Sequence, residues 1–269
     1  MSQGTAVPQS GPRLKLKGVG KYFDHDHKKL AVLEGIDLEV EAGEFCCLVG
    51  PSGCGKSTLL NIVAGLEKPD EGLVWANPRE VSGPGPDRVV IFQDLALFPW
   101  LDVWDNVDFG LKNLGLPAGE RRARVLKYLQ LVHLQEFLHA RLHQLSGGMR
   151  QRVALARSLA MEPEILLMDE PFSALDPHTR ERLQQELQDI WAATGATILF
   201  VTHGLKEAVA LGDKVVLLTT RPGRIQAVER VDLPRPRSVD DAPVLSISRR
   251  LKAQIGNWVD PVSRQEERV

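Results

Sequence analysis

The chain has 269 residues, of which 43% are apolar and 25% charged, and its net charge of −2 gives no sign of a nucleic-acid partner. Three cysteines are too few for a disulfide framework, and no apolar run approaches the roughly 18 residues of a membrane span. Composition therefore favours a globular protein of a reducing, cytoplasmic compartment.

Several elements are expected before residue 48. Residues 1–12 are rich in Gln, Ser, Gly and Pro, which predicts a flexible tail. Residues 14–19 alternate apolar and basic side chains, as a half-exposed strand does, and residues 32–40 predict a second strand. Between them, Tyr22 and Phe23 have two interpretations. Two aromatics after a strand belong most often to the core, but either ring could stack on an adenine base.

Residues 48–58 have the spacing of a phosphate-binding loop, set between an expected strand and an expected helix. Glycines let successive N–H groups point at phosphate oxygens, and the helix N-terminus adds its dipole. Lys56 supplies a full positive charge, and the Ser57 hydroxyl can ligate Mg²⁺. The sequence therefore predicts a nucleoside triphosphate as ligand. The residues expected to contact it are Gly50, Pro51, Ser52, Gly53, Cys54, Gly55, Lys56, Ser57 and Thr58.

The cysteine within this loop carries a prediction of its own. Cys54 lies at the expected helix N-terminus beside Lys56, and both features favour a thiolate. We therefore expect thiol alkylation to inhibit the protein and bound ATP to protect it.

The middle of the chain is expected to be helical. A buried strand at residues 89–92 ends before Gln93, and residues 94–111 are unusually apolar for a connection, with two tryptophans beside a proline. This segment is either additional core or an exposed apolar groove for a partner. Residues 120–140 then show apolar side chains at helical spacing, which predicts a helical layer.

A second glycine-bearing helix start follows. Ser146 is a good N-cap, and residues 153–160 read as a helix that Pro163 closes. Together with Gly147 and Gly148, this start forms either a second anion site or simply a tight turn.

Two later strands end in polar side chains. Residues 165–168 are an unbroken apolar run, as in a central parallel strand, and deliver Asp169 and Glu170 at the edge where open α/β sheets place ligands. Asp169 is expected to hold Mg²⁺ or its water, and Glu170 to accept a proton from the attacking water or to orient it. The buried strand at residues 197–202 ends in His203, a candidate site residue because of that position.

The alternation of strands and helices predicts an α/β fold, with a mostly parallel sheet, helices on both faces and a small antiparallel β portion from the first eighty residues. A helix is expected at residues 178–193, a last core strand at 214–220, a turn at 221–225 and a helix at 244–259. We expect three parts: a flexible tail (1–12), one large domain (13–237) with a helical subdomain inserted at about 94–160, and a C-terminal helix with a charged tail (238–269).

Taken together, these motifs resemble those of ATP-binding-cassette (ABC) transporter ATPases, a branch of the P-loop NTPases. The matching features occur in the family's order between about residues 14 and 220. They are the phosphate loop, Gln93, Leu145-Ser146-Gly147-Gly148-x-x-Gln151, the strand that ends in Asp169-Glu170, Ser173-Ala174-Leu175-Asp176, and His203. The Leu-Ser-Gly-Gly motif ahead of an Asp-Glu strand is the most specific of them.

The resemblance implies ATP hydrolysis by a head-to-tail pair of copies. Each ATP then lies between the phosphate loop of one copy and the motif 145–151 of the other, with Mg²⁺ on Ser57, Gln93 and Asp169. The resemblance makes Glu170 the catalytic base, His203 the γ-phosphate sensor, and Gln93 a contact to the transmembrane partner. Further ATP contacts are implied for Phe23, Ser146, Gly147, Gly148 and Gln151, and for Asp176, which would link the two sites.

A narrower resemblance points to the nitrate/sulfonate/taurine group of importer ATPases. It rests on residues 82–88, on the aromatic segment 97–107 and on Arg221-Pro222-Gly223-Arg224-Ile225. It implies a peripheral subunit at the cytoplasmic face of the inner membrane, with permease subunits as partners and, indirectly, a solute-binding protein. The alternative is a soluble ABC ATPase without a transport role. One departure stands out, since Gly204 occupies the position after His203 where the family usually has an acidic residue.

Overall fold

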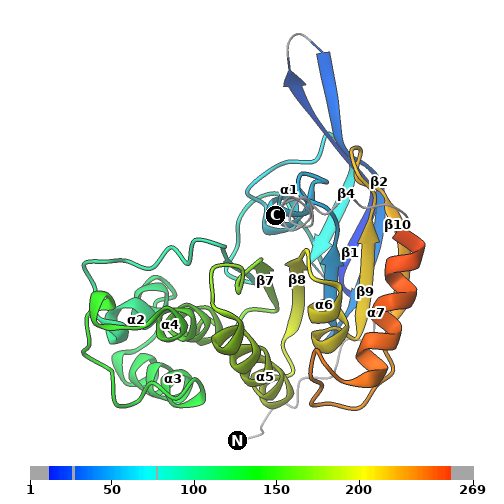
Figure 1. The fold of residues 1–269 in the computed structure, drawn as a ribbon. Coiled ribbons are helices and arrows are strands. Elements are labelled where there is room, and N and C mark those ends of the chain that lie inside the picture. The colour runs from blue at the N-terminus through cyan, green and yellow to red at the C-terminus, as the bar shows by residue number, and fades with distance from the viewer. Residues whose placement is uncertain (1–11, 26–27, 77, 256–269) are drawn as a thin grey trace, which may run out of the picture.

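The parallel core of the protein is a six-stranded sheet with the order β10-β9-β3-β8-β7-β6 (Figure 1). The structure, a computed structural model, describes residues 12–25, 28–76 and 78–255. Five strands run parallel, whereas β10 pairs antiparallel with β9 at one edge. The strands are β3 (Phe45–Val49), β6 (Arg88–Ile91), β7 (Ile165–Asp169), β8 (Thr197–Thr202), β9 (Lys214–Leu218) and β10 (Ile225–Arg230).

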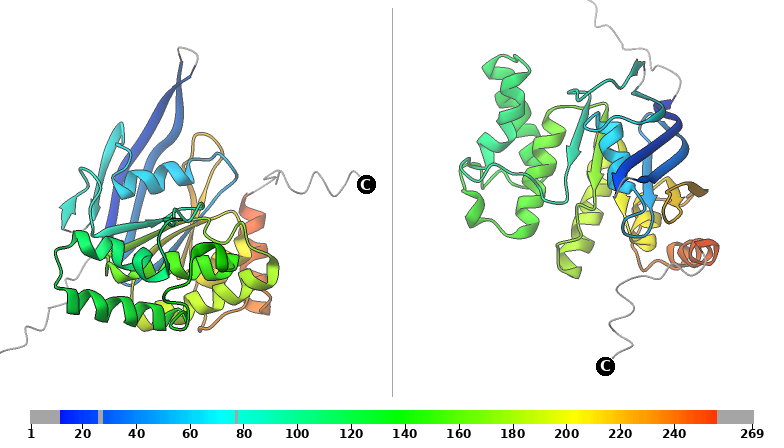
Figure 2. Two further views of the ribbon diagram at one scale, coloured as in Figure 1. Left: turned by 90° about the vertical axis from the view of Figure 1, so that its left-hand side faces the viewer. Right: turned by 90° about the horizontal axis from the view of Figure 1, so that it is seen from above.

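A second sheet has the order β2-β1-β4-β5 and is entirely antiparallel. Its strands are β1 (Pro12–His25), β2 (Lys28–Glu41), β4 (Glu71–Ala76) and β5 (Arg79–Glu80). The β1–β2 hairpin extends well beyond the body of the molecule (Figures 1 and 2). The expected antiparallel portion is thus confirmed, but the first strand is longer than the alternation indicated, so that Tyr22 and Phe23 lie within it.

Helices cover both faces of the parallel sheet. On one side, α1 (Lys56–Ala64) contacts both sheets and belongs to the core between them. On the other side, α4 (Gly147–Ala160), α5 (Pro177–Thr194), α6 (Leu205–Leu211) and α7 (Ala242–Ile255) contribute to the second core. Strand β3 is buried on both faces: Cys47 faces the second core and its neighbour Cys46 the first, as expected for adjacent strand residues.

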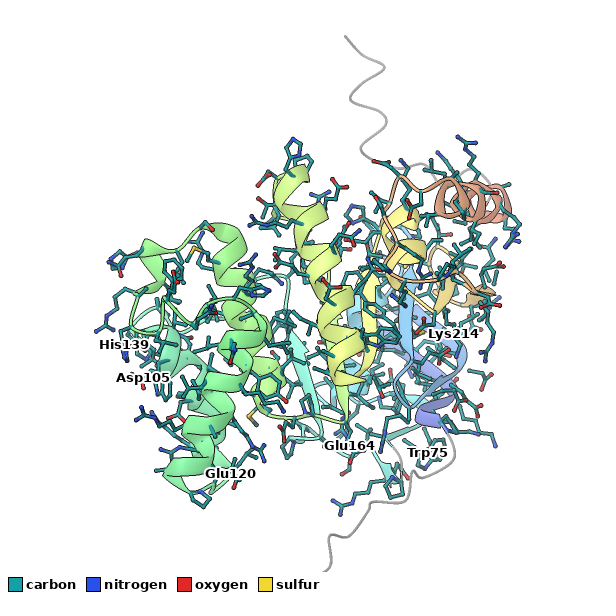
Figure 3. All side chains as sticks on the ribbon, turned by 90° about the horizontal axis from the view of Figure 1, so that it is seen from below. Trp75, Asp105, Glu120, His139, Glu164 and Lys214 are labelled. Carbon is teal, nitrogen blue, oxygen red and sulfur yellow. The ribbon has the colours of Figure 1, made fainter. Side chains whose placement is uncertain are left out.

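The helical insertion lies between β6 and β7. It comprises α2 (Val103–Asn113), α3 (Ala118–Leu131), the short 3₁₀ helix η1 (Leu142–Gln144) and α4. Figure 3 shows Asp105 of α2 and Glu120 of α3 on the opposite side of the molecule from Lys214 of β9. The helical pattern expected over 120–140 stops at Leu131, because His133 adopts a left-handed φ of 55° and the chain turns there.

The C-terminal third departs from expectation in one element. The strand expected to be the last of the core, at 214–220, is followed by β10, whose residues alternate between half-buried and exposed. The loop between them, residues 219–224, folds back towards β2 through a β-bridge between Leu33 and Gly223. Residues 1–11 and 256–269 lie outside the described part, which removes nearly all of the expected N-terminal tail, the charged tail and the end of the helix expected at 244–259.

Candidate nucleotide-binding site

The phosphate loop connects the end of β3 to the first turn of α1. Gly53 and Gly55 have φ values of 76° and 100°, a backbone region in which residues with a side chain are strained. A Cβ atom at Gly55 would also lie 2.7 Å from Cδ2 of Leu33. Glycine is therefore required at position 55 by both the backbone conformation and the close packing of β2 on the loop.

Lys56 lies inside this loop and is only 5% exposed. Its ammonium donates hydrogen bonds to the carbonyl oxygens of Gly50 (2.7 Å) and Pro51 (3.1 Å) and lies 3.8 Å from Oε1 of Glu170. The first turn of α1 contains no acidic residue, so the positive end of the helix has no carboxylate beside it within that turn. Together these features make the loop a cationic cradle for an anion.

The carboxylates at the end of β7 meet this cradle. The Ser57 hydroxyl donates a hydrogen bond to Oδ1 of Asp169 (3.1 Å), and burial raises the pKa of Asp169. Glu170 has a left-handed φ of 44°, which is unusual for a residue with a long side chain, while its N–H donates to the carbonyl of Val201 in β8. Strained backbone of this kind collects at functional sites, and here it aims a carboxylate at Lys56.

His203, at the end of β8, completes the same group of side chains. Its Nδ1 lies 3.1 Å from Oε2 of Glu170. The hydrogen bond from His203 lowers the pKa of Glu170, and the same contact raises the pKa of His203. An ionised carboxylate beside a protonated imidazole is therefore favoured at this position.

The loop after His203 is fixed by hydrogen bonds among residues that the sequence did not indicate as part of the site. The N–H of Gly204 donates to Oγ1 of Thr202 (2.9 Å), and the Thr202 hydroxyl hydrogen-bonds Glu207. Gln184 of α5 donates to the other oxygen of Glu207 (2.7 Å), and burial raises the pKa of Glu207. Gly204, which stands where the family usually has an acidic residue, is thus linked through Thr202 to the carboxylate of Glu207, three residues further on. Glu207 lies on α6, and the burial of a single glutamate leaves no signal in one sequence.

Cys54 corrects the expectation of a reactive thiolate. Its side chain is 1% exposed, and burial raises the pKa of the thiol above its ordinary value, outweighing the nearby charge of Lys56. The Cys54 sulfur would lie 2.5 Å from a Cβ atom at Gly50, so it fills the inside of the loop. The cysteine is a packing residue in a closed space, and the thiol is not activated.

The Ser-Gly-Gly start of α4 packs against the turn that opens α5. Oγ of Ser146 accepts a hydrogen bond from the Met149 N–H (3.2 Å), which confirms its expected place as N-cap. A Cβ atom at Gly148 would lie 2.9 Å from Cγ2 of Thr179, and Asp176 caps α5 by accepting from the Thr179 N–H (3.0 Å). Within the described residues, no hydrogen bond or ion pair joins residues 146–148 to the phosphate loop.

Three further expected site residues differ in position and exposure. Gln93 is exposed just after β6. Gln151 is 5% exposed and lines a small apolar cavity between α4 and α5. Phe23 is 42% exposed on β1, with the Lys21 ammonium 5.2 Å from its ring centroid. Their contacts to ATP stay predictions.

Comparison with known proteins places this geometry in a family. A family model described as ABC transporter matches residues 33–173. The chain is 48% identical over 239 residues to an uncharacterized ABC transporter ATP-binding protein of Methanocaldococcus jannaschii, covering 89% of this chain and 90% of that one. It is 48% identical over 223 residues to the taurine import ATP-binding protein TauB of Pseudomonas aeruginosa (83% and 85% covered). It is 43% identical over 233 residues to the bicarbonate transport ATP-binding protein CmpD of Synechococcus elongatus (86% and 84% covered).

A solved structure agrees with the same assignment. The chain is similar to a dimeric ATP-binding cassette in a post-hydrolysis state bound to ADP and phosphate, with a TM-score of 0.70 and 33% identity, covering 82% of this chain and all of that one. The match includes the P-loop fold and extends far beyond the phosphate loop. This chain is therefore a member of the ABC transporter family of ATP-binding proteins, which bind and hydrolyse ATP.

Proposed function

We propose that this protein is the ATPase subunit of an importer, coupling ATP hydrolysis to uptake of a small solute through a separate permease. The observation that carries the proposal is the convergence of Lys56, Ser57, Asp169, Glu170 and His203 at one edge of the parallel sheet. Relatives named for taurine import and bicarbonate transport support an import role.

The chemistry assigns a task to each of these side chains. Lys56 neutralises charge on the terminal phosphates, and its two carbonyl partners hold the ammonium within the loop. Because Glu170 is ionised by its contact with His203, it is suited to orient the attacking water and to accept its proton. His203 is more than half exposed, so its free edge is available to the γ-phosphate.

The oxygen atoms at this site fit Mg²⁺ as the ATP counter-ion. Ser57 and Asp169 together offer a hydroxyl and a carboxylate already in contact, which are hard ligands of the type that Mg²⁺ prefers. No group of three or more His, Cys, Asp or Glu side chains in the described ranges could hold a metal by itself. That suits an ion held mainly by phosphate oxygens and water, with Gln93 as a further ligand. Bound there, Mg²⁺ would neutralise charge on the phosphates.

Two copies packed head to tail would complete each ATP site. We interpret the Ser-Gly-Gly start of α4 as an anion-binding helix start, which packs on its own α5, while no hydrogen bond or ion pair among the described residues joins it to its own phosphate loop. It is therefore free to meet ATP on a second copy, with Gln151 behind it and Asp176 at the joint between the sites. The similar solved cassette is dimeric, which supports this arrangement. Phe23, exposed on β1, would stack on the adenine ring.

An aromatic patch that follows Gln93 in the sequence suits a permease contact. Phe98 packs against Trp100 (ring centroids 5.6 Å apart) and Phe109 (4.3 Å), and Trp100 and Phe109 remain 68% and 41% exposed. Aromatic side chains of this kind anchor protein interfaces. No helix in the described part of the chain is long and apolar enough to cross a membrane. We place the protein at the cytoplasmic face of the inner membrane, bound to permease subunits and, through them, served by a solute-binding protein.

The decisive experiment replaces the proposed base. Glu170→Gln removes the negative charge at nearly unchanged size, so turnover should fall by about a hundredfold or more while ATP still binds. Size-exclusion chromatography with saturating MgATP should then detect a dimer that the wild type forms only transiently. Glu164→Gln, at an exposed position paired with Arg13, is the matched control and should leave turnover unchanged. Wild-type turnover in Glu170→Gln would refute the role of Glu170.

The solute requires a separate test. We propose nitrate, a sulfonate, taurine or a similar small solute, in line with the taurine-import relative and the group-specific motifs. Affinity capture of the tagged chain from membranes should recover permease subunits, and Trp100→Ala should weaken that recovery. Capture of nucleic acid in place of a permease would contradict a transport role.

A further inference from the structure

The loop between β9 and β10 packs directly on the phosphate loop. A Cβ atom at Gly223 would lie 2.2 Å from the carbonyl oxygen of Cys54, so the two backbones touch. Gly223 also donates its N–H to the Val32 carbonyl (2.8 Å) and accepts from the Glu34 N–H (3.1 Å). Residues 219–224 are therefore wedged between β2 and the phosphate loop, and glycine at 223 permits this approach.

Hydrogen bonds within this loop fix its shape. The Thr219 hydroxyl donates to the Pro222 carbonyl (2.7 Å) and accepts from the Arg224 N–H (2.9 Å). The Thr219 N–H donates to the Arg224 carbonyl (2.9 Å). A side chain that projects from such a braced turn is held in a defined place.

Arg221 projects from this turn onto the outer tip of the phosphate loop. Its Nε donates a hydrogen bond to the carbonyl oxygen of Gly53 (2.9 Å), and its Nη2 lies 3.1 Å from the position that a Cβ atom of Gly53 would take. Glycine at 53 thus serves two purposes, since it permits the left-handed φ of 76° and leaves room for the guanidinium.

Holding that carbonyl orients the next N–H group. In a trans peptide the C=O and N–H bonds point in opposite directions, so a Gly53 carbonyl turned outward to Arg221 directs the Cys54 N–H into the loop. There the Cys54 N–H donates to the Pro51 carbonyl (3.2 Å). A phosphate-binding loop needs N–H groups that point inward, and a charged donor that holds the Gly53 carbonyl on the outer side favours that orientation of the Cys54 N–H.

The second arginine of the same turn differs in its contacts. Arg224 pairs with the half-buried Glu34 (2.7 Å), and within the described part of the chain none of its hydrogen bonds reaches the phosphate loop. Arg221 and Arg224 are both exposed arginines of the same turn, but only Arg221 contacts the phosphate loop, so that Arg224 can serve as the control position.

We propose that Arg221 is a positioning residue for ATP binding, which holds the Gly53–Cys54 peptide in the orientation that receives the phosphates. The inference rests on ATP binding and is independent of the solute and the permease. It assigns a physical task to two residues of the Arg-Pro-Gly-Arg-Ile segment, in which Arg221 holds the phosphate loop and Gly223 allows the close approach.

The test compares Arg221→Ala, Arg221→Lys and Arg224→Ala in the full chain. Loss of one charged hydrogen bond should raise the Kd for ADP, titrated with a fluorescent analogue, roughly tenfold in Arg221→Ala. The value for Arg224→Ala should stay within about twofold of wild type, and Arg221→Lys should recover part of the loss because its ammonium can still donate. Turnover at saturating ATP should change little, since the bond is made before the reaction.

Amide hydrogen exchange provides the second readout. Exchange in a peptide covering residues 53–55 should accelerate in nucleotide-free Arg221→Ala and not in Arg224→Ala, with melting temperatures within a degree or so of wild type. An unchanged Kd in Arg221→Ala would overturn the proposal. So would an equal rise in Arg224→Ala, which would indicate a general effect of charge, or a fall in melting temperature that matches the loss of affinity.

Discussion

Substituting alanine for Gly148 tests why the Ser-Gly-Gly turn needs its second glycine. The added methyl would lie 2.9 Å from Cγ2 of Thr179, roughly half an ångström inside ordinary carbon contact. Thr179 is branched at Cβ and lies in the first turn of α5, so it has little freedom to move aside. Overpacking of this size costs about 1–3 kcal/mol, and the better helix propensity of alanine returns at most about 1 kcal/mol.

We therefore expect Gly148→Ala to destabilise the nucleotide-free chain by about 1–2 kcal/mol, or about 2–4 °C in Tm for each kcal/mol. Thermal and urea unfolding of the isolated chain measure this directly. Gly147→Ala is the matched control, because its methyl would lie 3.5 Å from Leu175, an ordinary contact. Combining Gly148→Ala with Thr179→Ser removes the clashing methyl and keeps the hydroxyl, so stability should return.

Two results would refute this reasoning. Equal destabilisation by the two alanine substitutions would show that space at residue 148 is not the cause. Failure of Thr179→Ser to restore the stability of Gly148→Ala would show that the strain is relieved elsewhere. If Gly148→Ala also lowers turnover, and Thr179→Ser restores its stability without restoring its turnover, then Gly148 is required both for the packing of α5 and for the approach of ATP.

Three further outcomes are expected. The His203–Glu170 pair should stabilise the wild type over His203→Gln by less than about 1 kcal/mol, because His203 is largely exposed. In thermal melts, that difference should shrink as pH rises above 6.5 through the raised pKa of His203, and as pH falls below 4.5 through the lowered pKa of Glu170. Cys54 should react with iodoacetamide more slowly than an unfolded-chain cysteine at pH 7, by mass spectrometry; equal rates would contradict its burial. Lys214→Met should cost about 3–5 kcal/mol in urea unfolding because it strands a buried carboxylate, whereas Lys15→Met, at an exposed pair, should cost under about 1 kcal/mol.

Topology explains why the main site was accessible from sequence. Parallel strands end at a common edge, so a phosphate loop after one apolar run and Asp169-Glu170 after another had to meet. The structure places β8 between β3 and β7 and joins Ser57 to Asp169 by a hydrogen bond. The left-handed backbone of Glu170 was not predictable, because a glutamate in a sequence does not indicate a positive φ, as a glycine or an asparagine can.

The errors share a physical origin in tertiary context. The thiolate prediction for Cys54 rested on the helix start and Lys56, which are close in sequence, whereas the burial that raises its pKa depends on distant parts of the chain. Strand β10 was missed because Gln226, Glu229 and Arg230 make it read as solvated, although an edge strand needs only one buried face. The predicted end of the helix over 120–140 was wrong for the opposite reason. Apolar residues at helical spacing continue past His133, although the helix ends at Leu131 and the chain turns there.

The helix α5 has a mechanical consequence for a paired molecule. Near its start Thr179 bears on Gly148, and five residues later, roughly 7.5 Å along the axis, Gln184 grips the carboxylate that anchors the His203 loop. In a head-to-tail pair these two contacts, both in the first half of α5, would serve different ATP molecules. The helix α5 would then connect the two ATP sites, so that a displacement of α4 at one ATP is transmitted to His203 at the other.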